Sequence, residues 1–158
     1  MSDGQRSVQE IHSPNGRCFG CGPANEKGLR IRSFPNGDED ELVCDWRPEG
    51  HHEAFDGVVN GGILGSLLDC HSNWTAACAL MRRRGLDKPP CTVTADFHVR
   101  LRRPTPSDAT LHLSARPTEI DGDVVKVTAT VTCNGKVTAT CDGTFVAVGP
   151  GHPAYNGW

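Results

Sequence analysis

Apolar and polar residues alternate along most of the second half of the chain, and this two-residue period predicts β-strands. Turn signals separate the alternating segments, with Asp-Gly-Asp at 121–123 and Asn-Gly just before residue 136. Because Asn-Gly is a strong hairpin signal, we expect the last two segments to be neighbouring strands. The alternating segments after residue 90 are 91–102, 109–120, 124–133 and 136–148.

Two shorter segments near the start of the chain also alternate. Residues 28–34 (GLRIRSF) and 41–48 (ELVCDWRP) flank the turn sequence PNGDED at 35–40. This pattern predicts a β-hairpin. The stretch from 49 to 59 is rich in Gly and His, and we expect a loop there.

One segment, 60–84, has apolar residues at intervals of three and four, which predicts an α-helix. Asn60 suits the N-cap, because its side-chain oxygen can accept a hydrogen bond from an amide of the first turn. Three arginines fill the last turn, where cations complement the helix dipole, and Gly85 is a typical stop. A helix of about 25 residues is about 37 Å long, enough to span a sheet.

The predicted order is therefore two strands, one long helix and a four-stranded meander. An antiparallel sheet with one apolar face needs a cover, and this helix is the available one. We expect an α+β protein in which a sheet of about six strands wraps around one long central helix, the hot-dog arrangement. Residues 18–148 would form this domain, between a flexible N-terminal arm at 1–17 and an irregular C-terminal tail at 149–158.

Composition excludes several classes of function. The net charge is −3, so no overall positive field favours nucleic acid or an anionic membrane surface. The longest apolar stretch, 63–81, is interrupted by Asp69, His71 and Asn73, which argues against a membrane span. The first ten residues lack the basic start and apolar run of a secretory signal. We therefore expect a soluble cytoplasmic domain.

The chain has eight cysteines, and in a reducing compartment a disulfide framework is not expected. Cys18 and Cys21 form the single C-x-x-C pair. A structural zinc site needs two further ligands, and no second close pair follows in the sequence. We therefore expect no metal and no cofactor, with these residues forming a turn and the other thiols buried.

Three sequence blocks carry a resemblance to a known family: CFGCGPANEKGLRIRSF, HHEAFDGVVNGGILGSLLD and TADFHVRLRRPTP. Together they resemble the hot-dog-fold acyl-CoA thioesterases of the phenylacetate-pathway type, over residues 18–148. The middle block is the most specific, with an aromatic-Asp-Gly loop, paired glycines and an apolar run that ends in an acid. The family has His directly before the paired glycines, whereas this chain has Asn60.

The resemblance implies catalytic roles for Gly61 and Asp69. In the family, the first glycine amide polarises the thioester carbonyl, and an acid nine residues after the His activates water or attacks the carbonyl. Here Asn60 stands at the His position, where it can still cap the helix and bond a ligand. The hot-dog thioesterases pair their sheets and build their sites across the dimer interface, so a homodimer or a dimer of dimers (a homotetramer) is expected.

Elementary physics is consistent with these roles. The free amides and partial positive charge of a helix N-terminus suit an oxygen that gains negative charge in a transition state. Gly61 and Asp69 lie eight residues apart, about 12 Å along one helix, too far to reach one carbonyl carbon. One site would then combine residues from two subunits. The alternatives are that the glycines serve packing and that Asp69 is an exposed surface carboxylate.

Further residues are candidates for substrate binding. His52 lies in the loop before the helix, Gly62 offers a second uncovered amide, and Cys70 and Asn73 follow the acid. Arg102 and Arg103 could bind the phosphates of coenzyme A, because guanidinium groups pair with phosphate bidentately. The alternatives are a surface histidine and a solvated basic strand end.

The resemblance therefore implies an acyl-CoA thioesterase, a hydrolase that converts an acyl-CoA to a carboxylic acid and coenzyme A. Water would be activated by Asp69, and the Gly61 amide would hold the oxyanion. The alternative is a non-hydrolytic acyl-CoA- or lipid-binding hot-dog protein, in which Asn60 replaces the His because turnover is not needed.

Overall fold

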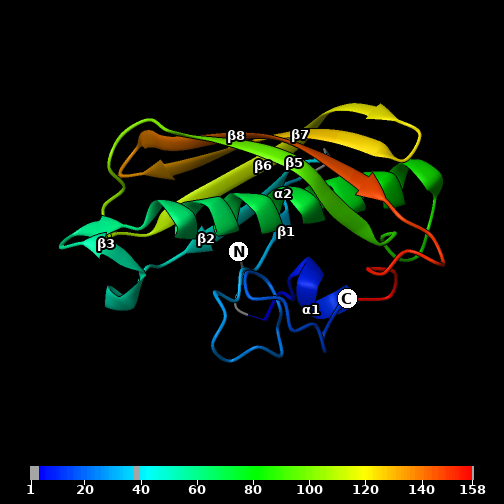
Figure 1. The fold of residues 1–158 in the computed structure, drawn as a ribbon, viewed down its shortest axis with the longest axis horizontal. Helices are drawn as coiled ribbons and strands as arrows, with labels where there is room; N and C mark the ends of the chain where they lie inside the picture. The colour runs from blue at the N-terminus through cyan, green and yellow to red at the C-terminus, as the bar shows by residue number, and fades with distance from the viewer. Residues whose placement is uncertain (1–3, 38–39, 158) are drawn as a thin grey trace.

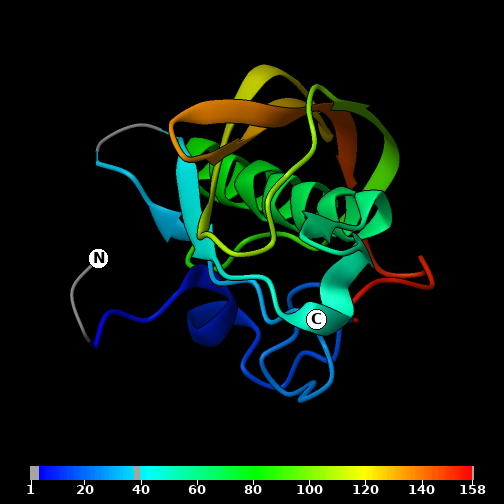
Figure 2. The ribbon, with the colours of Figure 1, turned by 90° about the vertical axis from the view of Figure 1, so that its left-hand side faces the viewer.

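The computed structural model describes residues 4–37 and 40–157. A six-stranded antiparallel sheet curves over one face of the long helix α2 (Gly61–Arg84), as Figures 1 and 2 show. This confirms the predicted hot-dog arrangement, with one central helix and six strands. The strands of this sheet are β1 (Phe34–Pro35), β2 (Leu42–Trp46), β5 (Thr92–Leu101), β6 (Leu111–Asp121), β7 (Val124–Cys133) and β8 (Lys136–Ala147).

The strand order is β1-β2-β6-β7-β8-β5, so the predicted four-stranded meander is wrong in one connection. Strands β6, β7 and β8 do form a meander, but β5 pairs with β8 at the far edge, with Phe97 opposite Gly143. The connection 102–110 carries two prolines and leads the chain across the sheet to β6, beside β2. Alternation predicts that a segment is a strand, but it does not determine its neighbours.

The predicted strand at 28–34 is wrong for residues 28–33. Leu29 and Ile31 are buried, which explains the alternation, but Arg30 has a φ of 55° and breaks the extended backbone. The amides of Leu29 and Ile31 donate to the carbonyls of Phe19 and Gly20, at 2.7 and 3.0 Å. This segment therefore pairs with the preceding loop, and only β1 joins the sheet.

The expected loop at 49–59 also contains regular structure. It holds a 3₁₀ turn, η1 (Gly50–His52), and a small hairpin of β3 (Glu53–Phe55) and β4 (Val58–Val59). Gly57 has a φ of 82°, a backbone conformation that favours glycine, and this lets the chain turn between the two strands.

The ends of α2 follow the predicted signals. The Asn60 side chain accepts hydrogen bonds from the amides of Gly62 and Ile63, at 2.8 and 3.2 Å. Gly85 ends the helix in a left-handed conformation with a φ of 62°. The leucines of the sheet-facing side, such as Leu67 and Leu68, are buried among the inward residues of the sheet. No helix in 4–37 and 40–157 has the length and hydropathy that a membrane crossing requires.

Residues 4 to 33 lie on the face of α2 opposite the sheet (Figures 1 and 2). The segment expected to be a loose arm contains the short helix α1 (Val8–His12), in which Gln9 is fully buried. The Gln9 amide donates to Ser33 Oγ at 2.9 Å, and its carbonyl accepts the Ser33 amide at 2.8 Å. The division into arm, domain and tail itself stays a prediction, and residues 1–3, 38–39 and 158 lie outside the described part.

Candidate active site

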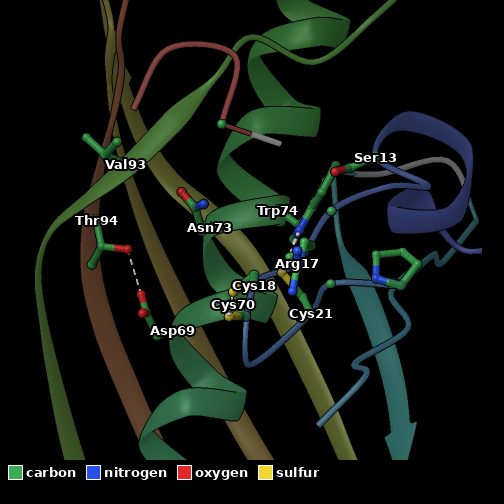
Figure 3. A pocket seen from close by; sticks show the side chains of 14 residues that line it. Ser13, Arg17, Cys18, Cys21, Asp69, Cys70, Asn73, Trp74, Val93 and Thr94 are labelled. Atoms are coloured by element: carbon green, nitrogen blue, oxygen red, sulfur yellow. Dashed lines mark hydrogen bonds between the residues drawn. The ribbon is translucent and has the colours of Figure 1, made fainter. Parts of the chain in front are cut away.

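A cavity of about 260 Å³ lies beside the middle of α2 (Figure 3). One wall is the loop before residue 24, which lies across the helix, and another is the beginning of β5. The lining is mostly apolar, with a carboxylate, an amide and three thiols among it. Its residues include Ser13, Arg17, Cys18, Cys21, Asp69, Cys70, Asn73, Trp74, Val93 and Thr94.

Asp69 is partly buried in this cavity and has one hydrogen-bond partner among residues 4–37 and 40–157. The Thr94 hydroxyl on β5 donates to Asp69 Oδ1 at 2.6 Å, across the gap between helix and strand (Figure 3). Burial raises the pKa of Asp69, and the hydrogen bond from Thr94 opposes this shift. The carboxylate is thus oriented by a hydroxyl and faces an apolar cavity, a suitable setting for a general base.

Asn73 lies one helical turn after Asp69 and also lines the cavity. Its Nδ2 group donates weakly to the Thr92 carbonyl at 3.4 Å. Its Oδ1 atom is buried and has no hydrogen-bond partner within 4–37 and 40–157. A buried acceptor without a partner is unusual in a folded protein.

The N-terminus of α2 opens into a second cavity, of about 410 Å³. Gly61, Arg102 and Arg103 line it, together with Phe55 and Leu101. The Asn60 side chain accepts the amides of Gly62 and Ile63, so the expectation that Gly62 offers an uncovered amide is wrong. Of the amides of Gly61, Gly62 and Ile63, only that of Gly61 has no hydrogen bond within the described ranges. The structure therefore brings Gly61 together with the two arginines and places Asp69 in the other cavity.

His52 lies in neither of these two cavities. Its ring is buried against Trp46, with a centroid distance of 4.9 Å, and Nδ1 accepts the Glu49 amide at 2.9 Å. Burial lowers its pKa, which favours the neutral ring. Its carbonyl accepts the Asn60 amide at 2.9 Å, so His52 helps to position the residue that caps α2.

Sequence reasoning missed Thr94 and Cys18 as residues of the first cavity. Thr94 lies in the alternating segment 91–102, and nothing in that pattern singles it out. Asp69 itself indicates that such a residue exists, because a carboxylate in the apolar middle of a helix requires a partner. Which residue supplies that partner depends on how α2 lies on the sheet, and the sequence does not determine this.

The chain also matches the model of a known protein family, and this match agrees with the fold. Residues 56–140 match the Thioesterase superfamily, and the chain therefore belongs to that family. Its six-stranded sheet around one long helix is the hot-dog fold of these proteins. None of the curated proteins compared with the chain matches it.

Solved structures show the same fold. A Thioesterase superfamily protein from Shewanella loihica PV-4 is 26% identical, with a TM-score of 0.63, over 80% of this chain and 98% of that one. The E. coli PaaI protein from the phenylacetic acid degradation operon is 18% identical, with a TM-score of 0.66, over 80% and 85%. The protein smu.793 of Streptococcus mutans, bound to acetyl-CoA, is 15% identical, with a TM-score of 0.63, over 75% and 89%.

Proposed function

We propose that this protein is a cytoplasmic acyl-CoA thioesterase, which hydrolyses an acyl-CoA to a carboxylic acid and coenzyme A. The observation that carries the proposal is the partly buried Asp69 carboxylate, held by Thr94 in an apolar cavity at the middle of α2. Membership of the Thioesterase superfamily supports the reaction type. The likeness to a protein solved with acetyl-CoA supports a coenzyme A ester as substrate, and the sequence motifs and the PaaI likeness favour the phenylacetate-pathway type.

In the proposed reaction, Asp69 removes a proton from a water molecule while the water oxygen attacks the thioester carbonyl carbon. Thr94 keeps the carboxylate in its orientation toward the water. The carbonyl oxygen becomes an oxyanion, which the Gly61 amide stabilises. The carbon–sulfur bond then breaks, and the coenzyme A thiolate takes up the proton that Asp69 holds.

This mechanism requires a second copy of the chain, because Gly61 and Asp69 line different cavities of one protomer. We propose that the dimer forms along β5, which pairs on one side with β8 and is an edge of the sheet. Phe97 and Leu101 on this strand are 43% and 58% exposed. A Cβ atom on Gly61 would lie 3.0 Å from Leu101 Cδ1, so these apolar residues lie over the start of α2. A partner strand here would cover them and bring its own helix to the site. A homodimer and a dimer of dimers would both contain this shared site.

Arg102 and Arg103 have a proposed role in binding the coenzyme A phosphates. Both lie at the end of β5 and line the cavity that holds Gly61. Arg102 Nε donates to Thr140 Oγ1 at 3.3 Å, which leaves the other nitrogens of its guanidinium group for a ligand. An acyl-CoA could then place its phosphates near these arginines and its thioester at Gly61.

The test is hydrolysis of a panel of aliphatic and aromatic acyl-CoA esters, followed by release of the free thiol. We expect turnover of at least one ester and a loss of about 10²–10⁴ in kcat for Asp69→Asn, the usual contribution of a positioned acid–base group. Asp87→Asn, an exposed carboxylate just beyond α2, is the matched control and should keep the wild-type rate. Equal rates for both variants and the wild type would contradict the role of Asp69.

One observation favours a second candidate function, binding of an acyl-CoA or lipid without hydrolysis. The family has His at the position of Asn60, and here the Asn60 oxygen is already engaged by two helix amides. Tight binding of an acyl-CoA by the wild type without release of thiol from any ester of the panel would favour this function.

A further inference from the structure

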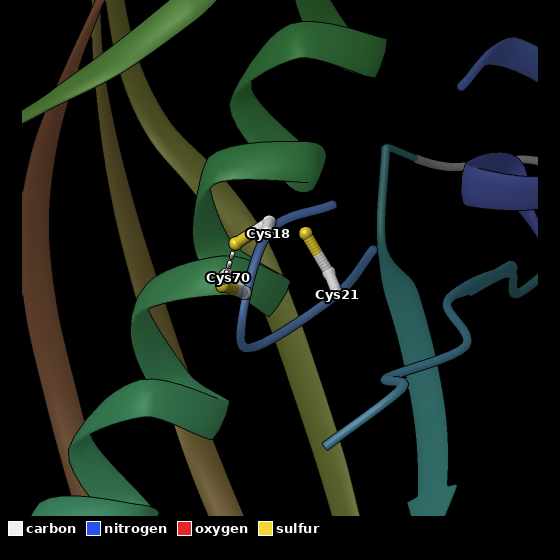
Figure 4. A group of neighbouring side chains, drawn as sticks. All are labelled: Cys18, Cys21 and Cys70. Carbon is white, nitrogen blue, oxygen red and sulfur yellow. Dashed lines mark hydrogen bonds between the residues drawn. The ribbon is translucent and has the colours of Figure 1, made fainter. Parts of the chain in front are cut away.

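Three cysteines from distant parts of the sequence converge beside the cavity of Asp69. Cys18 and Cys21 lie on the N-terminal loop and Cys70 on α2, and their sulfur atoms all lie within 4.8 Å of one another (Figure 4). The sulfurs of Cys18 and Cys70 are 3.7 Å apart. All three side chains are free thiols in this structure.

The loop backbone is shaped to bring these thiols together. A Cβ atom on Gly20 would lie 2.3 Å from the Cys70 sulfur, so only glycine lets the loop approach the helix this closely. Gly22 closes the turn by donating its amide to the Cys18 carbonyl at 2.9 Å. A Cβ there would lie 2.5 Å from the Cys18 nitrogen. The two glycines of the C-F-G-C-G sequence therefore determine the positions of the sulfurs.

We propose that Cys18, Cys21 and Cys70 bind a zinc ion. With zinc–sulfur bonds of about 2.3 Å, the sulfurs of a tetrahedral site are about 3.8 Å apart, close to the separation of Cys18 and Cys70. Trp74 Nε1 donates to the Cys21 sulfur at 3.3 Å, the kind of outer hydrogen bond that orients a metal ligand. The fourth position would face the adjacent cavity and would be taken by water.

In the sequence, Cys18 and Cys21 are the one close pair of cysteines, and two ligands do not predict a metal site. Cys70 supplies a third ligand only once α2 is packed against the loop. Zinc at this position would fix the loop to the middle of the helix, next to Asp69. The proposal does not depend on hydrolysis, because metal binding can be measured without any acyl-CoA.

The experiment uses the full chain, purified without chelator and kept reduced. Metal analysis should find about one equivalent of zinc per chain. After the zinc is removed, titration with Co²⁺ should give the intense absorption of a tetrahedral cobalt–thiolate site, and added Zn²⁺ should abolish it. Failure of the reduced wild type to bind either ion would overturn the proposal.

Variants locate the ligands. Cys70→Ser should lose the cobalt–thiolate absorption and the stoichiometric zinc, whereas Cys91→Ser, a partly buried thiol outside the cluster, should keep both. Cys18→Ser is the second variant, because Cys18 is exposed and its substitution should leave the fold intact. Unchanged metal binding in Cys18→Ser and Cys70→Ser would overturn the proposal. A Cys18–Cys70 disulfide in the purified protein, with no metal binding after reduction, would instead assign the cluster to redox chemistry and overturn it.

Discussion

The hydrogen bond between Thr94 and Asp69 offers a sharp test of the proposed site. Thr94→Val keeps the shape of the side chain but removes the hydroxyl that donates to Asp69 at 2.6 Å. Without this hydroxyl the carboxylate is no longer held in one orientation toward the attacking water. Misplacement of a catalytic group by about 1 Å can cost about 100-fold in rate, so we expect kcat/KM to fall by about 10- to 100-fold. The assay is thiol release from whichever acyl-CoA the wild type accepts.

Two comparisons separate this effect from a general disturbance of β5. Thr94→Ser retains the hydroxyl and should stay within a few-fold of the wild type. In the Asp69→Asn background, Thr94→Val should have little further effect, because the two residues would act as one unit. The proposed role of Thr94 is refuted if Thr94→Val keeps the wild-type rate, or if it lowers the rate by the same factor with and without the Asp69 carboxylate.

Two further predictions concern stability and assembly. Gln9→Ala removes both hydrogen bonds to Ser33 and leaves the Ser33 amide buried without a partner. It should therefore lower the free energy of unfolding in urea by about 2–4 kcal/mol. The exposed Gln5→Ala is its control, and equal stabilities would show that the segment is a loose arm after all. The wild type should be at least a dimer by light scattering at micromolar concentration, and Leu101→Asp should shift it toward the monomer with loss of turnover. A fully active wild-type monomer would contradict the shared site.

The local signals in the sequence predicted the elements well. Asn60 and Gly85 define the ends of α2, because both act through hydrogen bonds and dihedral angles within a few residues. Alternation predicted strands β5 to β8 for the same local reason. It failed at residues 28–33, where the buried side chains alternate but Arg30 has a positive φ. A hydrophobic pattern records which residues are buried, and a loop packed on a helix can produce the same pattern as a strand.

The candidate site was only partly predictable. Gly61 and Asp69 followed from the family resemblance and from the physics of a helix N-terminus and a mid-helix acid. Thr94 and the approach of Cys18 to Cys70 depend on how a strand and a loop lie against α2. Such contacts join residues far apart in the sequence, and no local preference encodes them. The placement of His52 against Trp46 is another such contact.

The pairing of β2 with β6 has a consequence for synthesis of the chain. Leu42 lies opposite Ala115, and apart from the two-residue β1, β6 is the neighbour of β2 in the sheet. While the ribosome is still making α2 and β5, β2 has no long strand to pair with. Contacts this distant in sequence slow folding, because closing the long loop between the two strands costs entropy before their pairing repays it. The N-terminal part of the molecule must therefore wait for the C-terminal strands, and the nascent chain exposes an unpaired apolar strand during that interval.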